Sequence, residues 1–120
     1  MWNKLLITKS CCIMSNYENL KVWHRAIALA VSIYRLTGEN KYFQKDFSLR
    51  DQMRRASVSI SSNISEGDEL GSDKQAIRQF YIAKGSAAEL YTQLIISDKI
   101  GYLKDDEMKF LTNRKLDLNL

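Results

Sequence analysis

The 120-residue sequence contains no proline, one histidine and only two cysteines. Without proline the commonest cause of helix kinks is missing, which favours long uninterrupted helices. Cys11 and Cys12 are adjacent, too close for an ordinary disulfide, and no third cysteine offers a partner. No apolar run approaches the roughly 20 residues that span a bilayer. These absences favour one globular domain in a reducing, cytoplasmic compartment, with no membrane partner.

The beginning of the chain has neither helical nor strand periodicity. A short apolar run at residues 5–7 is soon interrupted by Lys9, and no small-residue cleavage site follows, so this is a poor signal peptide. We therefore expect residues 1–14 to be a disordered or dispensable N-terminal extension, with Met14 as a candidate for the natural start. Residues 15–120 then form the domain.

The net charge of +4 is unevenly distributed. Between Lys21 and Arg55 there are eight basic residues and three acidic ones, whereas between Glu89 and Glu107 there are five acidic residues and two lysines. The molecule is therefore expected to be basic toward its first half and acidic toward its second.

Apolar residues recur at the alternating three-and-four spacing of a helix face. The spacing predicts helices over about 18–37, 48–66 and 73–100, and a weaker one over about 105–115. We expect a polar and aromatic loop over 39–47. The fold class that follows is all-α, a four-helix bundle with a short fourth helix.

Residues with special backbone preferences predict where these helices begin and end. Ser48 is a good N-cap for the second helix, and Ser72 with Gln75 forms a capping box for the third. Glycine adopts the left-handed conformation that ends a helix at little energetic cost. Three glycines are placed to end helices in this way: Gly38, Gly67 and Gly101.

The second and third helices carry serine, alanine and glycine where leucine is usual, which lets helix backbones approach closely. A glycine inside a helix costs about 1 kcal/mol relative to alanine, so we predict a close helix crossing at Gly85 and Ser86. Polar residues on the two helices are expected to form a network that locks them together. This structural set consists of Asn63, Glu66, Gly67, Gly85, Ser86 and Glu89.

Catalytic chemistry is not indicated. Glu66 and Glu89 could in principle do acid–base work or hold a metal, but di-metal sites of helix bundles need Glu-x-x-His pairs. The single histidine, His24, has no such partner. We therefore expect no enzymatic activity, no catalytic residue, no metal and no cofactor.

Basic residues of the first two helices are the candidates for binding nucleic-acid phosphates: Lys21, Arg25, Arg50, Arg54 and Arg55. Lys21 and Arg25 are four residues apart, as are Arg50 and Arg54, so each pair shares a helix face. The fork of guanidinium donors suits phosphate. The alternative is a solvated face whose arginines pair with acids of this chain or of a neighbouring subunit.

The first and third helices carry more apolar surface than a short fourth helix can cover. Burying one large apolar side chain contributes roughly 1.5–3 kcal/mol. We therefore expect copies of the chain to cover this surface in a homo-oligomer.

Five phrases stand in a specific order: Leu20-Lys21-Val22-Trp23, Gln52-Met53-Arg54-Arg55-Ala56, residues 59–67, residues 82–90 and Ile100-Gly101-Tyr102. Over about residues 17–103 they resemble the four-helix-bundle protein family encoded in 23S ribosomal RNA intervening sequences. The chain departs from the family pattern at Phe43, which is followed by glutamine where a proline is usual. Its fourth helix also ends earlier than is usual.

The resemblance implies an up-down bundle that assembles into a cyclic homopentamer in the bacterial cytoplasm, without enzymatic activity. Family members are suspected of binding nucleic acid. A related bundle, the accessory protein of diversity-generating retroelements, is a pentamer that works with RNA and a reverse transcriptase. We therefore expect a non-catalytic oligomer that binds RNA or DNA through its first two helices. The alternative is a protein-interaction adaptor whose ring engages a polymerase-like or other protein partner.

Overall fold

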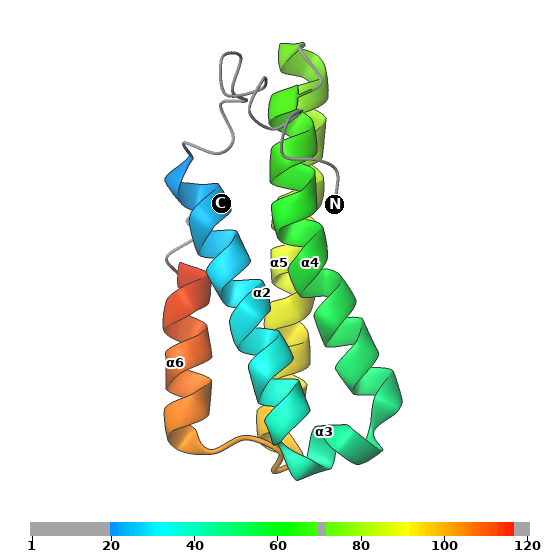
Figure 1. Ribbon diagram of the computed structural model, residues 1–120, viewed down its shortest axis with the longest axis vertical. Coiled ribbons are helices and arrows are strands. Elements are labelled where there is room, and N and C mark those ends of the chain that lie inside the picture. Colours follow the sequence, from blue (N-terminus) through cyan, green and yellow to red (C-terminus); the bar gives the residue numbers. More distant parts are fainter. Residues whose placement is uncertain (1–19, 70–71, 117–120) are drawn as a thin grey trace, which may run out of the picture.

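A computed structural model describes residues 20–69 and 72–116, and helices account for nearly all of these residues (Figure 1). The helices are α2 (Lys21–Glu39), α3 (Lys41–Lys45), α4 (Phe47–Glu69), α5 (Asp73–Lys99) and α6 (Asp105–Leu116). No strand occurs in the two described ranges, so the all-α prediction is confirmed. The expected N-terminal extension, residues 1–14, lies outside the described residues.

The four longer helices pack side by side in a bundle. α4 packs against both α2 and α5, and α6 packs against the same two helices. In Figure 1, α5 lies behind α4. The short α3 crosses one end of the bundle and connects α2 to α4. Helices that follow one another in the chain are therefore neighbours in space, as their short connections require.

The core is made by one apolar face from each helix. Its fully buried side chains include Leu29 and Ile33 of α2, Ile60 of α4 and Leu94 of α5. Small residues lie among them, and the hydroxyl of buried Ser57 donates to the Arg54 carbonyl at 2.9 Å. Because this hydroxyl is satisfied within its own helix, a small polar residue is buried in the bundle without an unpaired hydroxyl.

The prediction of a loop over residues 39–47 is wrong, because this segment contains helix α3. Gly38 does not end α2 in a left-handed conformation; α2 continues to Glu39, and Asn40 follows in an extended conformation. The Asn40 side chain then accepts a hydrogen bond from Tyr42 N at 2.9 Å and caps α3. An asparagine that ends one helix and begins the next thus replaces the glycine stop.

The start of α4 also differs from the prediction. The helix begins at Phe47, and the carboxylate that caps it is Asp46, whose Oδ1 accepts from Leu49 N at 3.1 Å. Ser48 lies inside the helix, where its hydroxyl accepts from Gln52 Nε2 at 3.3 Å. A carboxylate is a stronger partner than a hydroxyl for the positive end of the helix dipole. Asp46 lies two residues before Ser48, so the helix begins earlier than predicted.

Gly67 does not end α4, which continues to Glu69. The residue is buried, and a Cβ at this position would lie 3.1 Å from Gln79 Cβ and 3.2 Å from the Ala76 carbonyl oxygen of α5. Gly67 is therefore a point of close approach between α4 and α5, where a Cβ would be tightly crowded and would require the neighbouring atoms to shift.

The predicted ends of α5 are confirmed. Ser72 Oγ accepts from Gln75 N at 3.3 Å at the start of the helix. At the other end Gly101 has a φ of 85°, with Tyr102 N donating to the Ser97 carbonyl at 2.9 Å. This is the pair of features that defines a glycine-terminated helix stop.

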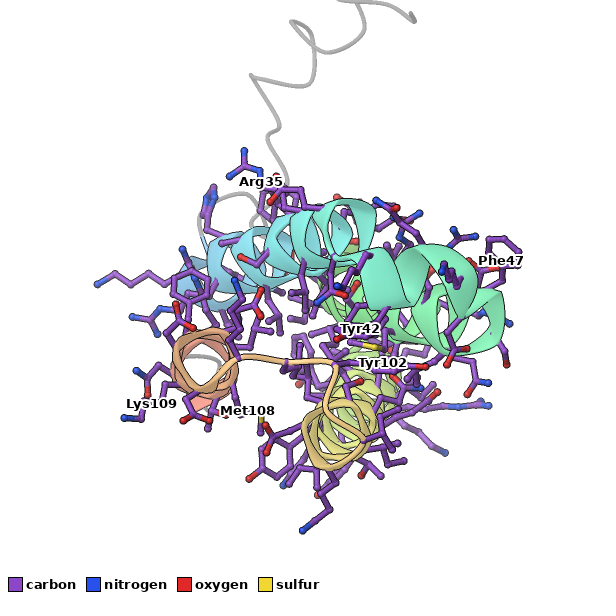
Figure 2. All side chains as sticks on the ribbon, turned by 90° about the horizontal axis from the view of Figure 1, so that it is seen from below. Arg35, Tyr42, Phe47, Tyr102, Met108 and Lys109 are labelled. Carbon is purple, nitrogen blue, oxygen red and sulfur yellow. The ribbon has the colours of Figure 1, made fainter. Side chains whose placement is uncertain are left out.

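Tyr102 then ties the end of the bundle together. Its carbonyl accepts from Asn40 Nδ2 at 2.8 Å, and its hydroxyl donates to Asp46 Oδ2 at 3.0 Å. Its ring stacks on Tyr42 with 5.2 Å between ring centres, and Figure 2 shows the two residues together at the end of the bundle that faces the viewer. The bond to Asp46, and the negative charge of that carboxylate, raise the pKa of Tyr102 above its ordinary value of 10.0.

Candidate nucleic-acid interface

The five candidate cations of the first two helices fall into two separate groups. Lys21 and Arg25 lie in the first turns of α2, whereas Arg54 of α4 contacts Thr37 near the opposite end of α2. At 1.5 Å of rise per residue, Arg25 and Thr37 are separated by about 18 Å along the helix. Lys21 and Arg25 therefore do not share one patch with the arginines of α4.

Arg50 has a carboxylate partner. Its Nε donates to Asp51 Oδ1 at 3.0 Å, and its guanidinium lies 4.7 Å from the centre of the Phe47 ring. This arrangement is the alternative that the sequence left open, in which an arginine pairs with an acid of its own helix. Such an exposed pair contributes little to stability, about 1 kcal/mol or less.

Arg54 is half-buried and held in place by two residues of α2. Its Nε donates to Thr37 Oγ1 at 2.8 Å, and its guanidinium lies 4.7 Å from the centre of the Tyr34 ring. Thr37 is fixed in turn, because its own hydroxyl donates to the Ile33 carbonyl at 2.7 Å. Within the described residues no carboxylate lies within ion-pair distance of Arg54.

Arg55 is exposed, and it forms no hydrogen bond or ion pair with any residue that the structure describes. With Arg54 it lines a hollow of about 540 Å³ between α2 and α4, which we call the Arg54–Arg55 hollow. The other lining residues are Tyr34, Asp51, Val58 and Ser59. The structure thus brings together two of the five candidate cations with an exposed aromatic ring. The spacing within one helix does not indicate Tyr34 or Thr37 as their partners.

The polar network between α4 and α5 is smaller than predicted and has a different centre. Asn63 Nδ2 donates to the Ser59 carbonyl at 2.7 Å and to Ser59 Oγ at 2.9 Å. Ser59 Oγ in turn lies 2.9 Å from Ser86 Oγ of α5. Glu66 and Glu89 are exposed and stand outside this network, and Glu89 accepts from Gln93 of its own helix. Ser59 could have been found from its spacing, because it lies four residues before Asn63 on the same face.

The predicted close crossing at Gly85 is wrong within the chain. Gly85 is exposed, and a Cβ built on it meets no atom within 4 Å. Ser86, the next residue, faces α4 and makes the contact with Ser59. One residue along a helix turns the side chain by about 100°, so Gly85 faces outward while Ser86 faces the neighbouring helix.

Two exposed apolar surfaces remain on the molecule. The first, which we call the α5 stripe, runs along one side of α5, with Tyr81 68% exposed and Ile77 55% exposed. Its members are Ile77, Tyr81, Gly85, Ala88, Thr92, Ile96 and Ile100. The second, the α2/α4 groove, has a volume of about 610 Å³. It is lined by Ile27, Ala30, Val31, Tyr34, Arg35, Val58, Ser61 and Ser62.

Metal binding finds no support in the described residues, where no group of three or more histidine, cysteine, aspartate or glutamate side chains is close enough to hold an ion. Among the same residues, no helix is both long and apolar enough to cross a bilayer. The fold and the candidate site together define a helix-bundle protein with a small polar network inside and apolar surfaces outside.

Comparison with known proteins gives the family. The chain belongs to the 23S rRNA-intervening sequence protein family, whose sequence model matches residues 18–118. It is similar to a solved protein of unknown function from the S23 ribosomal protein family of Bacteroides thetaiotaomicron. The two chains are 26% identical, with a TM-score of 0.76 over 82% of this chain and 91% of the other. No curated protein matches this chain.

Proposed function

We propose that this protein is a non-catalytic scaffold that assembles into a homo-oligomer, a ring of five copies, and binds nucleic acid. The observation that carries the proposal is the presence of two unlike apolar surfaces on one chain, the α5 stripe and the α2/α4 groove. A contact between unlike surfaces leaves one of each free on the resulting pair. Such contacts either continue into a filament or close into a ring.

The outward position of Gly85 supports this assembly. A glycine inside a helix costs about 1 kcal/mol relative to alanine, and no neighbour among residues 20–69 and 72–116 requires it. Its place in the middle of the α5 stripe is suited to a second copy whose backbone approaches α5 closely. The close helix crossing expected at Gly85 is then one between copies.

Nucleic-acid binding is supported by the charges on α4. Arg54 and Arg55 have no carboxylate partner among the described residues, whereas Arg50 is paired with Asp51. A ring repeats such a site around its rim, so weak contacts of single copies add through multivalency. Lys21 and Arg25, at the other end of α2, form a second basic group that is separate from these arginines.

Two measurements test this function. Solution scattering or light scattering of the full chain is expected to give a mass several times 13.9 kDa, and native mass spectrometry gives the number of copies. A compact particle of the mass of one chain would refute the scaffold. Binding of fluorescent RNA is expected to weaken steeply as salt rises, because phosphate contacts release counterions.

A further inference from the structure

The Arg54–Arg55 hollow offers hydrogen-bond donors that the chain itself leaves unused. A guanidinium carries five N–H bonds, and toward the described residues Arg54 uses only the one at Nε, on Thr37. Arg55 uses none within the described residues. Two neighbouring guanidinium groups with free donors favour an oxyanion, because charge-assisted hydrogen bonds are the stronger kind.

Arg54 is also positioned before any ligand arrives. The Thr37 hydroxyl holds its Nε, and the Tyr34 ring supports the guanidinium plane from α2. A side chain that is already ordered loses less conformational entropy on binding. Thr37 and Tyr34 are therefore positioning residues for Arg54. The sequence alone does not predict this role for either residue.

Acidic residues do not cancel this charge. Among the described residues, Asp51 lines the hollow, and its Oδ1 accepts from Arg50 Nε at 3.0 Å. Glu89 lies nearby, in a neighbouring hollow that Asp51 and Arg55 also line. With Arg50 counted, the three arginines exceed these two carboxylates by one charge. The hollow thus attracts an anion despite the aspartate at its edge.

The walls of the hollow point to the kind of anion. Tyr34 is 47% exposed and Val58 is 41% exposed, and both stand beside the two guanidinium groups. Cations next to an exposed aromatic ring are typical of sites for single strands, where phosphates meet the cations and unpaired bases lie on the ring. A duplex hides its base faces, so it would leave these apolar side chains uncovered.

We propose that the Arg54–Arg55 hollow binds one phosphate of a single-stranded nucleic acid, with the adjoining base against Tyr34 and Val58. The inference rests on the proposed function and deepens it, because it names the strand type and the atoms that bind it. The hollow and the α2/α4 groove share Tyr34 and Val58. A second copy seated toward Ile27 and Val31 therefore leaves the hollow at the border between subunits.

Fluorescence anisotropy with a labelled single strand, titrated at several salt concentrations, tests the site in the full-length protein. Arg54→Gln and Arg55→Gln are each expected to weaken binding about tenfold. Each should also lower the slope of log affinity against log salt by about 0.7. Arg78→Gln is the matched control, since it removes an exposed arginine of α5 outside the hollow, and should change affinity much less.

Two further variants separate positioning from charge. Thr37→Val removes the hydroxyl that holds Arg54 but keeps both guanidinium groups, so affinity should fall about threefold while the salt slope stays unchanged. Tyr34→Leu should weaken binding of the single strand but not of a duplex of the same length. Circular dichroism and the oligomer mass confirm that each variant remains folded and assembled.

Several outcomes would overturn the assignment. If the protein binds nucleic acid and the two arginine variants behave like Arg78→Gln, the hollow is not the site, although the proposed function stands. Equal affinity for duplex and single strand, or for a lone mononucleotide and the strand, refutes the single-strand assignment. Loss of the oligomer in Arg55→Gln would mean that an acid of a second copy fills the hollow. No binding by the unmodified protein, even at low salt, refutes the proposed function itself.

Discussion

At the scale of single residues, position relative to a neighbouring backbone matters more than residue type. Gly67 and Gly85 both lie inside helices, yet a Cβ would meet α5 atoms at 3.1 and 3.2 Å in the first case and none within 4 Å in the second. The sequence correctly indicates that small residues bring α4 and α5 together. It does not tell which glycine stands at the contact, because that depends on how the two helices are rotated.

Substituting Gly67 tests this difference. Gly67→Ala is expected to lower the free energy of unfolding by about 1–3 kcal/mol, because a methyl group is forced against Gln79 and the Ala76 carbonyl. Gly38→Ala is the matched control, since a Cβ there has only an ordinary contact of 3.8 Å with Arg54. Urea denaturation of the two variants, followed by circular dichroism, checks this. Equal stability of both would contradict the close approach at Gly67.

Tyr102 gives a prediction for pH. Its pKa is raised by Asp46, so the folded state favours the neutral phenol, and the stabilisation by the Tyr102–Asp46 bond is fully present below pH 10.0. It is lost as the pH rises through the raised pKa. Tyr102→Phe should therefore be less stable than the parent near neutral pH, with the difference shrinking above pH 10.0. A difference that stays constant through this alkaline range would rule out the hydroxyl as its cause.

At the scale of helices, the periodicity of apolar residues predicted the presence of the long helices well, but it predicted where they begin and end less well. The bounds of α5 and α6 agree with the expected 73–100 and 105–115 within one residue. The short α3 was missed because a five-residue helix is too brief to show a period. Its caps, Asn40 and Asp46, are ordinary polar residues of a loop until tertiary contacts with Tyr102 select their side-chain bonds.

The start of α4 is tested by comparing two capping candidates. Asp46→Ala should destabilise the protein by about 1 kcal/mol, because the Leu49 amide loses its acceptor. Ser48→Ala is expected to change stability by only a few tenths of that value, since Ser48 is an exposed residue inside the helix. Because Asp46 also accepts from the Tyr102 hydroxyl, thermal denaturation of both variants is measured in a Tyr102→Phe background, where the difference reports the cap alone. A larger effect at Ser48 would restore the boundary expected from the sequence.

The candidate site shows the same limit between sequence and structure. The pairing of an arginine with Asp51 was an open alternative in the sequence, but adjacency alone does not bring the Arg54 and Arg55 side chains to one hollow. The bond from Arg54 to Thr37, seventeen residues away in the chain, and the stacking of Arg54 on Tyr34 depend on the register between α2 and α4. The spacing within one helix carries no information about that register.

At the scale of the whole molecule, the α5 stripe is the feature to test. Tyr81→Asp is expected to reduce the measured mass toward 13.9 kDa while helicity is retained, because a buried unpaired charge would cost more than the contact gains. Gly85→Leu should act similarly by preventing the close approach of a second backbone. Phe110→Asp is the control, since Phe110 is 50% exposed but lies on α6, outside both apolar surfaces. Normal assembly of Tyr81→Asp would show that the stripe is not an interface.

The α5 stripe and the α2/α4 groove are different surfaces, so each copy in the proposed ring would contact its two neighbours in different ways. In the proposed ring, a chain damaged only at the stripe would keep an intact groove, so it would still accept one neighbour and would then offer the next copy no surface to join. Mixed with normal chains, it would act as a terminator that leaves open arcs in place of rings. A minority of damaged chains in a cell would then prevent ring closure by the normal chains, so the damaged chain would have a dominant-negative effect.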